Sequence, residues 1–141
     1  MAPSDHDVRV LRGLVAETLR SIHGYEEAQG EAANLQVKTL FARRAIERRQ
    51  VMMEFCSEIK RLSGASFSNA GRMVDGLLPT PLSPAREIEL AEAGLRRLCQ
   101  DAMIDPLLSA PVQSLIRRAY DLIKMGQDEM LNLHHLTRAA S

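Results

Sequence analysis

The sequence predicts an all-α fold: a four-helix bundle in which two antiparallel hairpins are joined by a long crossover with a short extra helix. Apolar residues recur at helical spacing in four stretches, and almost nothing alternates as a strand would. Two of the three connections between these stretches are short and the middle one is long. The chain has 141 residues, of which 45% are hydrophobic. We therefore expect one domain, residues 1–141, with a core of its own.

The first two helices are expected over residues 5–33 and 35–62. The apolar stripe of the first comprises Val8, Leu11, Val15, Ile22 and Tyr25. The stripe of the second comprises Val37, Phe41, Ala45, Met52, Phe55, Ile59 and Leu62. Asp5 is a candidate N-cap for the first helix, and Ser63-Gly64 predicts a glycine C-cap at the end of the second.

The last two helices are expected over residues 84–104 and 110–137. Ser83 followed by Pro84 is typical of an N-cap with proline at the first helical position. The third stripe comprises Ile88, Ala91, Leu95, Leu98 and Ala102. The fourth comprises Val112, Leu115, Ala119, Leu122, Ile123, Met130 and Leu133.

The lengths of the connections predict the order in which the helices pack. The short links near residue 34 and at 105–111 indicate antiparallel hairpins. The crossover, residues 63–83, contains glycines, prolines and a brief helical run at 69–78. It is long enough to return along helices of roughly 30–42 Å, so that the second and third helices run parallel. Two hairpins joined in this way form a ferritin-like connection.

Charge and composition exclude several classes of protein. Eighteen basic residues balance eighteen acidic ones, which argues against a nucleic-acid partner, since phosphate binding needs a basic excess. The cluster Arg43, Arg44, Arg48 and Arg49 is interpreted as a solvated, partly paired helix face, with a phosphate-binding patch as the alternative. No apolar run approaches the roughly 20 residues of a membrane span. Without a signal-peptide pattern at the N-terminus, we expect a cytoplasmic protein.

Several short motifs resemble those of a family of small bacterial four-helix-bundle proteins of unknown function that is related to ferritins. They are Gly24-Tyr25-Glu26-Glu27-Ala28, Lys38-Thr39-Leu40-Phe41, Ala45-Ile46-Glu47-Arg48-Arg49-Gln50, Glu92-Ala93-Gly94 and Gln127-Asp128-Glu129-Met130. The resemblance extends from about Val8 to Leu136. It implies a ferritin-like up-down bundle.

A ferritin-like bundle raises the question of a di-metal site. Such sites take a glutamate from each of two helices and Glu-x-x-His from each of the other two. This chain contains no Glu-x-x-His; its second helix offers only Glu47-x-x-Gln50, and its third offers Glu92. We therefore expect a degenerate site with no catalytic residue and no cofactor. The alternative is a metal-binding or oxidoreductase protein that uses Glu47 and Glu92 to bind iron or manganese.

A polar interruption in the second helix predicts a buried network. The apolar stripe breaks between Ala45 and Val51, which leaves Glu47 near the inward face. A carboxylate inside a bundle needs a hydrogen-bonding or charged partner. The expected members of this polar core network are Tyr25, Glu47, Gln50 and Gln127.

Interaction with protein is the leading functional hypothesis. Methionine suits adaptable binding surfaces, and an apolar patch along the crossover is expected from Met53, Met73, Leu77 and Leu78. We therefore predict a non-catalytic bundle that associates with itself or with another protein and has no nucleic-acid or membrane partner. A carrier that holds a small molecule or lipid inside the bundle is a further alternative.

Overall fold

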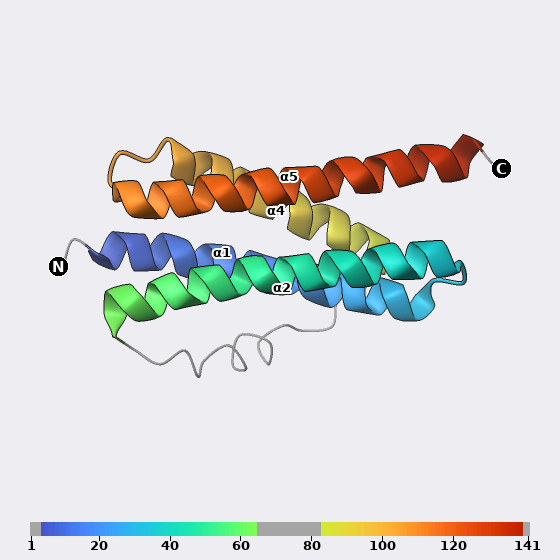
Figure 1. Ribbon diagram of the computed structural model, residues 1–141, viewed down its shortest axis with the longest axis horizontal. Helices are drawn as coiled ribbons and strands as arrows, with labels where there is room; N and C mark the ends of the chain where they lie inside the picture. Colours follow the sequence, from blue (N-terminus) through green and yellow to red (C-terminus); the bar gives the residue numbers. More distant parts are fainter. Residues whose placement is uncertain (1–3, 65–82, 140–141) are drawn as a thin grey trace.

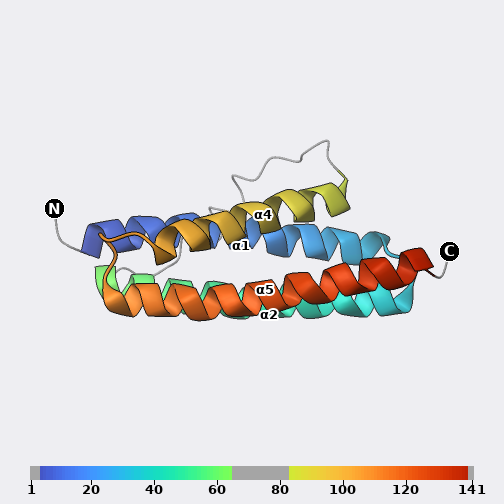
Figure 2. The same ribbon diagram turned by 90° about the horizontal axis from the view of Figure 1, so that it is seen from above.

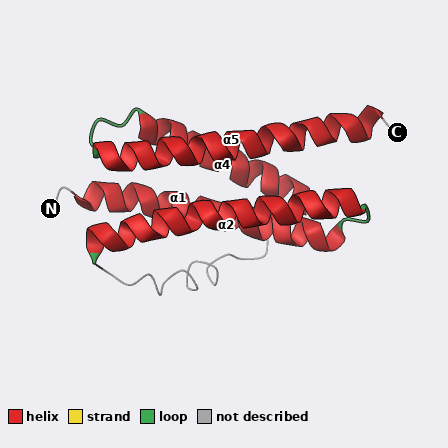
Figure 3. Cartoon of the chain, in the orientation of Figure 1, coloured by secondary structure: helices red, strands yellow, loops and turns green. Residues whose placement is uncertain are grey.

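The structure, a computed structural model, describes residues 4–64 and 83–139. Every element in these two ranges is a helix (Figure 3): α1, Ser4–Glu31; α2, Leu35–Ser63; α4, Pro84–Met103; and α5, Ala110–Ala139. The prediction of an all-α bundle of four packed helices is confirmed, and no helix end differs from the expected one by more than two residues. The short helix expected at 69–78 lies outside the described residues.

Local sequence explains where the helices begin and end. The side chain of Asn34 accepts hydrogen bonds from the backbone N–H groups of Gln36 and Val37, which caps α2. Gly64 ends α2 at φ 69°, a left-handed conformation that favours glycine. Ser83 caps α4 by accepting from the N–H of Arg86, and Pro84 follows in the first turn.

Neighbouring helices of the bundle are antiparallel. Figures 1 and 2 show that α1 and α5 run in one direction and that α2 and α4 run in the other. The packed pairs are α1–α2, α1–α4, α4–α5 and α2–α5, so α2 and α4 lie on a diagonal. Because these two helices are parallel, the end of α2 and the start of α4 lie toward opposite ends of the bundle.

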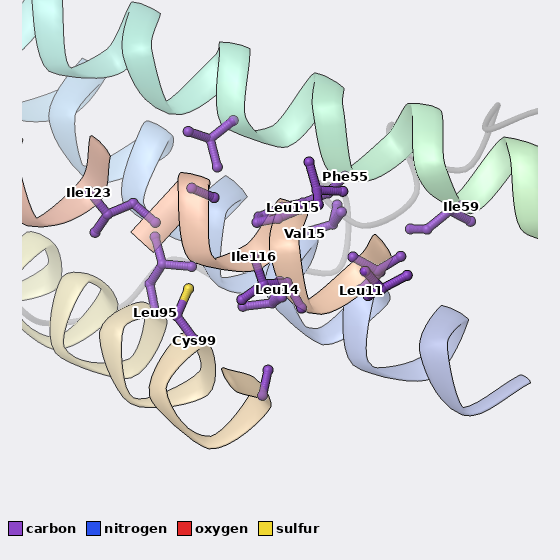
Figure 4. Close-up of a cluster of buried hydrophobic side chains, with 14 of the residues drawn as sticks. Leu11, Leu14, Val15, Phe55, Ile59, Leu95, Cys99, Leu115, Ile116 and Ile123 are labelled. Atoms are coloured by element: carbon purple, nitrogen blue, oxygen red, sulfur yellow. The ribbon is translucent and has the colours of Figure 1, made fainter. Parts of the chain in front are cut away.

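The main apolar core fills the half of the bundle that contains the start of α1. It includes Leu11 and Leu14 of α1, Phe55 of α2, Leu95 of α4 and Ile116 of α5, each fully buried (Figure 4). A smaller apolar cluster fills the other half and comprises Tyr25, Ala28, Ala45 and Ile88, with Phe41 and Met130 packed against it.

Among the described side chains of the expected apolar stripes, Leu98 and Leu122 are exposed. Leu98 is 37% exposed, and Cys99 takes the buried position beside it. Leu122 is 51% exposed while its neighbour Ile123 is fully buried. In both cases two apolar residues are adjacent in sequence, and one helix face has room for only one of them.

The N-terminal turn of α1 is bound to the link between α4 and α5. His6 Nε2 lies 2.7 Å from a carboxylate oxygen of Asp105, and Asp7 accepts a hydrogen bond from the N–H of Ser109 at 3.1 Å. The hydrogen bond with His6 lowers the pKa of Asp105, with a smaller contribution from the N–H of Leu107. None of the helices in the described ranges is long and apolar enough to cross a bilayer.

Candidate functional site

The interior of the bundle contains a layer of charged side chains between its two apolar clusters. Two arginines of α2, one helical turn apart, point inward: Arg44 is 2% exposed and Arg48 is fully buried. They continue a regular inward stripe that runs through Val37, Phe41, Arg44, Arg48, Val51, Phe55 and Ile59. A buried guanidinium needs carboxylates and acceptors around it, and α4, α5 and α2 itself supply them. Among the described residues, Nε of Arg44 and Nη1 of Arg48 have no hydrogen-bond partner.

Glu92 of α4 is the centre of this layer. Its Oε1 accepts hydrogen bonds from Arg48, with Nε at 3.0 Å and Nη2 at 2.8 Å. The Tyr25 hydroxyl of α1 donates to the same oxygen at 2.5 Å, and Nε2 of Gln127 of α5 lies 3.4 Å from Oε2. Each of the four helices therefore contributes one side chain, and we name Tyr25, Arg48, Glu92 and Gln127 the polar layer.

Arg44 connects the polar layer to the surface. Its Nη1 lies 2.8 Å from Glu47 of α2, and its Nη2 lies 2.7 Å from Glu129 of α5. The side chains of Glu47 and Glu129 are 37% and 50% exposed. The buried guanidinium of Arg44 is therefore paired with two carboxylates that lie between it and the solvent. A shallow cavity of about 210 Å³ opens here between α2 and α5, with Gln50, Leu122 and Met125 also in its lining.

Gly126 of α5 provides the space that the two arginines occupy. A β-carbon at this position would overlap Nη1 of Arg44 and would lie 3.2 Å from Nη2 of Arg48. Both guanidiniums are held by carboxylates, so moving either one away would weaken an ion pair. The close approach of α5 to α2 at this level therefore favours glycine.

Burial changes the acid–base chemistry of the groups near the layer. Burial, together with the negative charge of Glu92, raises the pKa of the Tyr25 hydroxyl, which therefore stays protonated and donates its hydrogen bond. Burial also raises the pKa of Cys99 to about 12 and, to a smaller extent, that of Cys56. Neither thiol is activated as a nucleophile, because nucleophilic cysteines need a lowered pKa.

The structure separates the residues that the sequence suggested for a site. Tyr25 and Gln127 lie in the polar layer, whereas Glu47 lies at its rim and Gln50 is exposed in the groove between α2 and α5. Met53 of the expected apolar patch is 64% exposed. The other members of that patch, Met73, Leu77 and Leu78, lie outside the described residues.

The interpretation of the arginine cluster as a solvated face is wrong for half of its members. Arg43 and Arg49 are exposed, and Arg49 pairs with Glu26 of α1, but Arg44 and Arg48 are buried. The four arginines look alike in sequence because charged residues are seldom fully buried. Their spacing distinguishes the buried arginines from the exposed ones. Of the four, Arg44 and Arg48 alone fall on the stripe defined by Phe41, Val51 and Phe55.

The donor set of the layer does not suit a metal cation. Glu47 and Glu92 are each bound to a guanidinium, so a divalent ion placed between them would add two positive charges beside two buried arginines. Among the side chains that the structure describes, at residues 5–64 and 83–130, no three of His, Cys, Asp or Glu are grouped closely enough to hold a metal ion.

Removal of the charge on Glu92 tests the polar layer. We expect Glu92→Gln to lower the free energy of unfolding by about 3 kcal/mol, because it leaves Arg48 as a buried cation without a counter-ion. The matched control Glu47→Gln changes a half-exposed partner of Arg44 and should cost about 1 kcal/mol or less. Urea unfolding followed by circular dichroism measures both, and equal costs would contradict the assignment.

A pair of glycine substitutions tests the fit of α5 against the arginines. Both Gly126 and Gly13 lie inside helices, where alanine is favoured by about 1 kcal/mol. Gly13→Ala should realise this gain, since nothing lies within 4 Å of its added β-carbon. Gly126→Ala should be less stable than Gly13→Ala by about 2 kcal/mol, because it displaces Arg44. Thermal unfolding would contradict this if the two variants were equally stabilised.

Comparisons with protein-family models, with curated proteins and with solved structures find no match to this chain. Function is therefore inferred from the geometry of the polar layer and from the surface around it.

Proposed function

We propose that this chain is a non-catalytic, ferritin-like helical bundle that acts through protein–protein interaction, self-association included, and whose ferritin-type site is degenerate. The observation that carries the proposal is the polar layer, in which Arg48 engages the inward carboxylate of Glu92 by two hydrogen bonds at mid-bundle. A catalytic or metal-binding bundle needs open ligand positions in this region. Here arginine, tyrosine and glutamine side chains occupy them.

The helix arrangement supports the ferritin-like part of the proposal. All adjacent helices are antiparallel, while the second and third described helices, α2 and α4, are parallel and diagonal to one another. This order follows from two hairpins joined by one long crossover, which is the connection of ferritin-like bundles. Glu92 and Tyr25 come from α4 and α1, and they meet in the bundle interior, where such bundles build their sites.

The alternative, a metal-binding or oxidoreductase protein that uses Glu47 and Glu92, is less well supported by the geometry. Both carboxylates are neutralised by arginine, and the thiol of Cys99 is protonated at neutral pH. The interior thus has neither a free ligand set nor an activated nucleophile among the described residues. The surface, in contrast, displays large apolar side chains that a partner can cover.

Metal content separates the two proposals. The untagged chain, purified from cells supplied with iron and manganese and assayed by plasma mass spectrometry, should contain far less than one metal ion per chain. Near-stoichiometric metal that disappears in Glu92→Gln would overturn the non-catalytic proposal. Glu89→Gln is the matched control, because Glu89 lies on the same helix with a side chain that is 69% exposed.

A further inference from the structure

The face formed by α2 and α5 exposes several large apolar side chains. This face is nearest to the viewer in Figure 1, and Figure 2 shows α1 and α4 on the opposite side. Among the described side chains of these two helices, five large apolar ones are more than half exposed: Leu35 at the start of α2, and Ile46, Met53, Leu122 and Met125 nearer the middle. Met53 lines one shallow cavity between α2 and α5, and Leu122 and Met125 line a second one.

These side chains are spaced like a helix-packing seam. On α5, the groove residues Leu115, Arg118, Leu122, Met125 and Glu129 follow one another at intervals of three and four. On α2, Ile46, Gln50, Met53 and Ser57 have the same spacing. Intervals of three and four keep residues on one helix face and characterise seams between helices. Apart from Leu115, which is buried in the main core, the residues of both seams are at least partly exposed.

The α5 seam is complementary to the same seam of a second copy that runs in the opposite direction. Its four central residues read basic, apolar, apolar, acidic: Arg118, Leu122, Met125 and Glu129. When two copies of α5 lie antiparallel, Leu122 of one faces Met125 of the other, and Arg118 faces Glu129. A surface that matches itself after a half-turn is the property that a two-fold symmetric dimer requires.

The same two-fold axis also matches the α2 seam. Ile46 and Met53 are seven residues apart, so an axis that crosses α2 near Gln50 brings the level of Ile46 in one copy to the level of Met53 in the other. Gln50 lines the same cavity as Leu122 and Met125, which places the centre of the α2 seam level with the centre of the α5 seam. One axis therefore serves both helices.

The charges and the size of this face also suit a second copy. Glu129 is held at the edge of the groove by Arg44, at 2.7 Å, and its side chain is 50% exposed. Two adjacent helices of about 29 residues present roughly 40 × 20 Å, or about 800 Å². A stable interface of standard size buries about 800 Å² of each partner. An apolar centre with a charged rim is the usual anatomy of such an interface.

We infer that the α2–α5 face is a dimer interface in which a second copy of this chain packs antiparallel about a two-fold axis, with Leu122 against Met125 and Arg118 against Glu129. The inference rests on the proposed function and specifies its partner and its surface.

Sedimentation velocity of the full chain over a range of concentrations tests this interface. The parent should form dimers, and Leu122→Glu should raise the dissociation constant at least about 100-fold, because it places a carboxylate from each copy in the apolar centre. Leu107→Glu is the matched control: Leu107 is 72% exposed in the link between α4 and α5. That variant should dimerise like the parent. Circular dichroism should show the same helix content in all three proteins.

A second pair of variants tests the register of the two copies. Arg118→Glu places like charges opposite each other at Glu129 and should raise the dissociation constant about tenfold or more. Arg117→Glu makes the same change one residue away, off the seam, and should have no such effect. Dimers unaffected by Leu122→Glu and Arg118→Glu would overturn this interface and leave the proposed function in place. A parent chain that stays monomeric at its highest soluble concentration would overturn self-association itself, and metal content would still test the interior independently.

Discussion

The contact between Arg48 of α2 and Glu92 of α4 is the interaction on which the rest of this structure depends. These two helices lie on a diagonal of the bundle, so the guanidinium has to cross the core to reach the carboxylate. Tyr25 and Gln127 complete the contact from α1 and α5. A polar layer that takes one side chain from each helix disfavours any shift of register, because a shifted helix leaves a buried charge without its partner. Glycine at position 126 leaves the space in which this layer forms.

The interior of the bundle is occupied, and the function proposed for this chain therefore lies at its surface. The inward polar groups that a ferritin-type site would use are bound to other groups of the chain, and the apolar clusters on both sides of the layer are filled. Arg44 links the two regions, because it lies against Gly126 beside the buried layer and holds Glu129 at the edge of the α2–α5 groove. The same arginine that helps to fill the core thus positions a charge of the proposed dimer interface.

Periodicity predicted the four helices to within two residues at each end. Gly64 and Ser83 act locally, through hydrogen bonds or backbone conformation within a few residues, so sequence alone indicates them. Asp5, the expected N-cap of the first helix, lies inside the first turn of α1 instead. The polar layer depends instead on contacts between distant residues. Glu47 and Gln50 were expected inside because the apolar stripe breaks there, but helix rotation directs Arg44 and Arg48 inward. Hydrophobicity scales treat arginine as a surface residue. An arginine whose guanidinium is paired with a carboxylate can nevertheless be buried in a protein interior. Tyr25 and Gln127 were named as members of the network from a resemblance of short motifs and not from the apolar pattern.

A double-mutant cycle between Arg48 and Glu92 tests most directly whether the buried contact organises the bundle. Arg48→Met, Glu92→Leu and the double variant would be compared with the parent by urea unfolding. We expect each single change to cost about 3 kcal/mol or more, and the double variant to recover most of that loss, because it removes both charges from the core. Costs that add to within about 0.5 kcal/mol would mean that the two residues act independently. That result would contradict the claim that their contact organises the bundle.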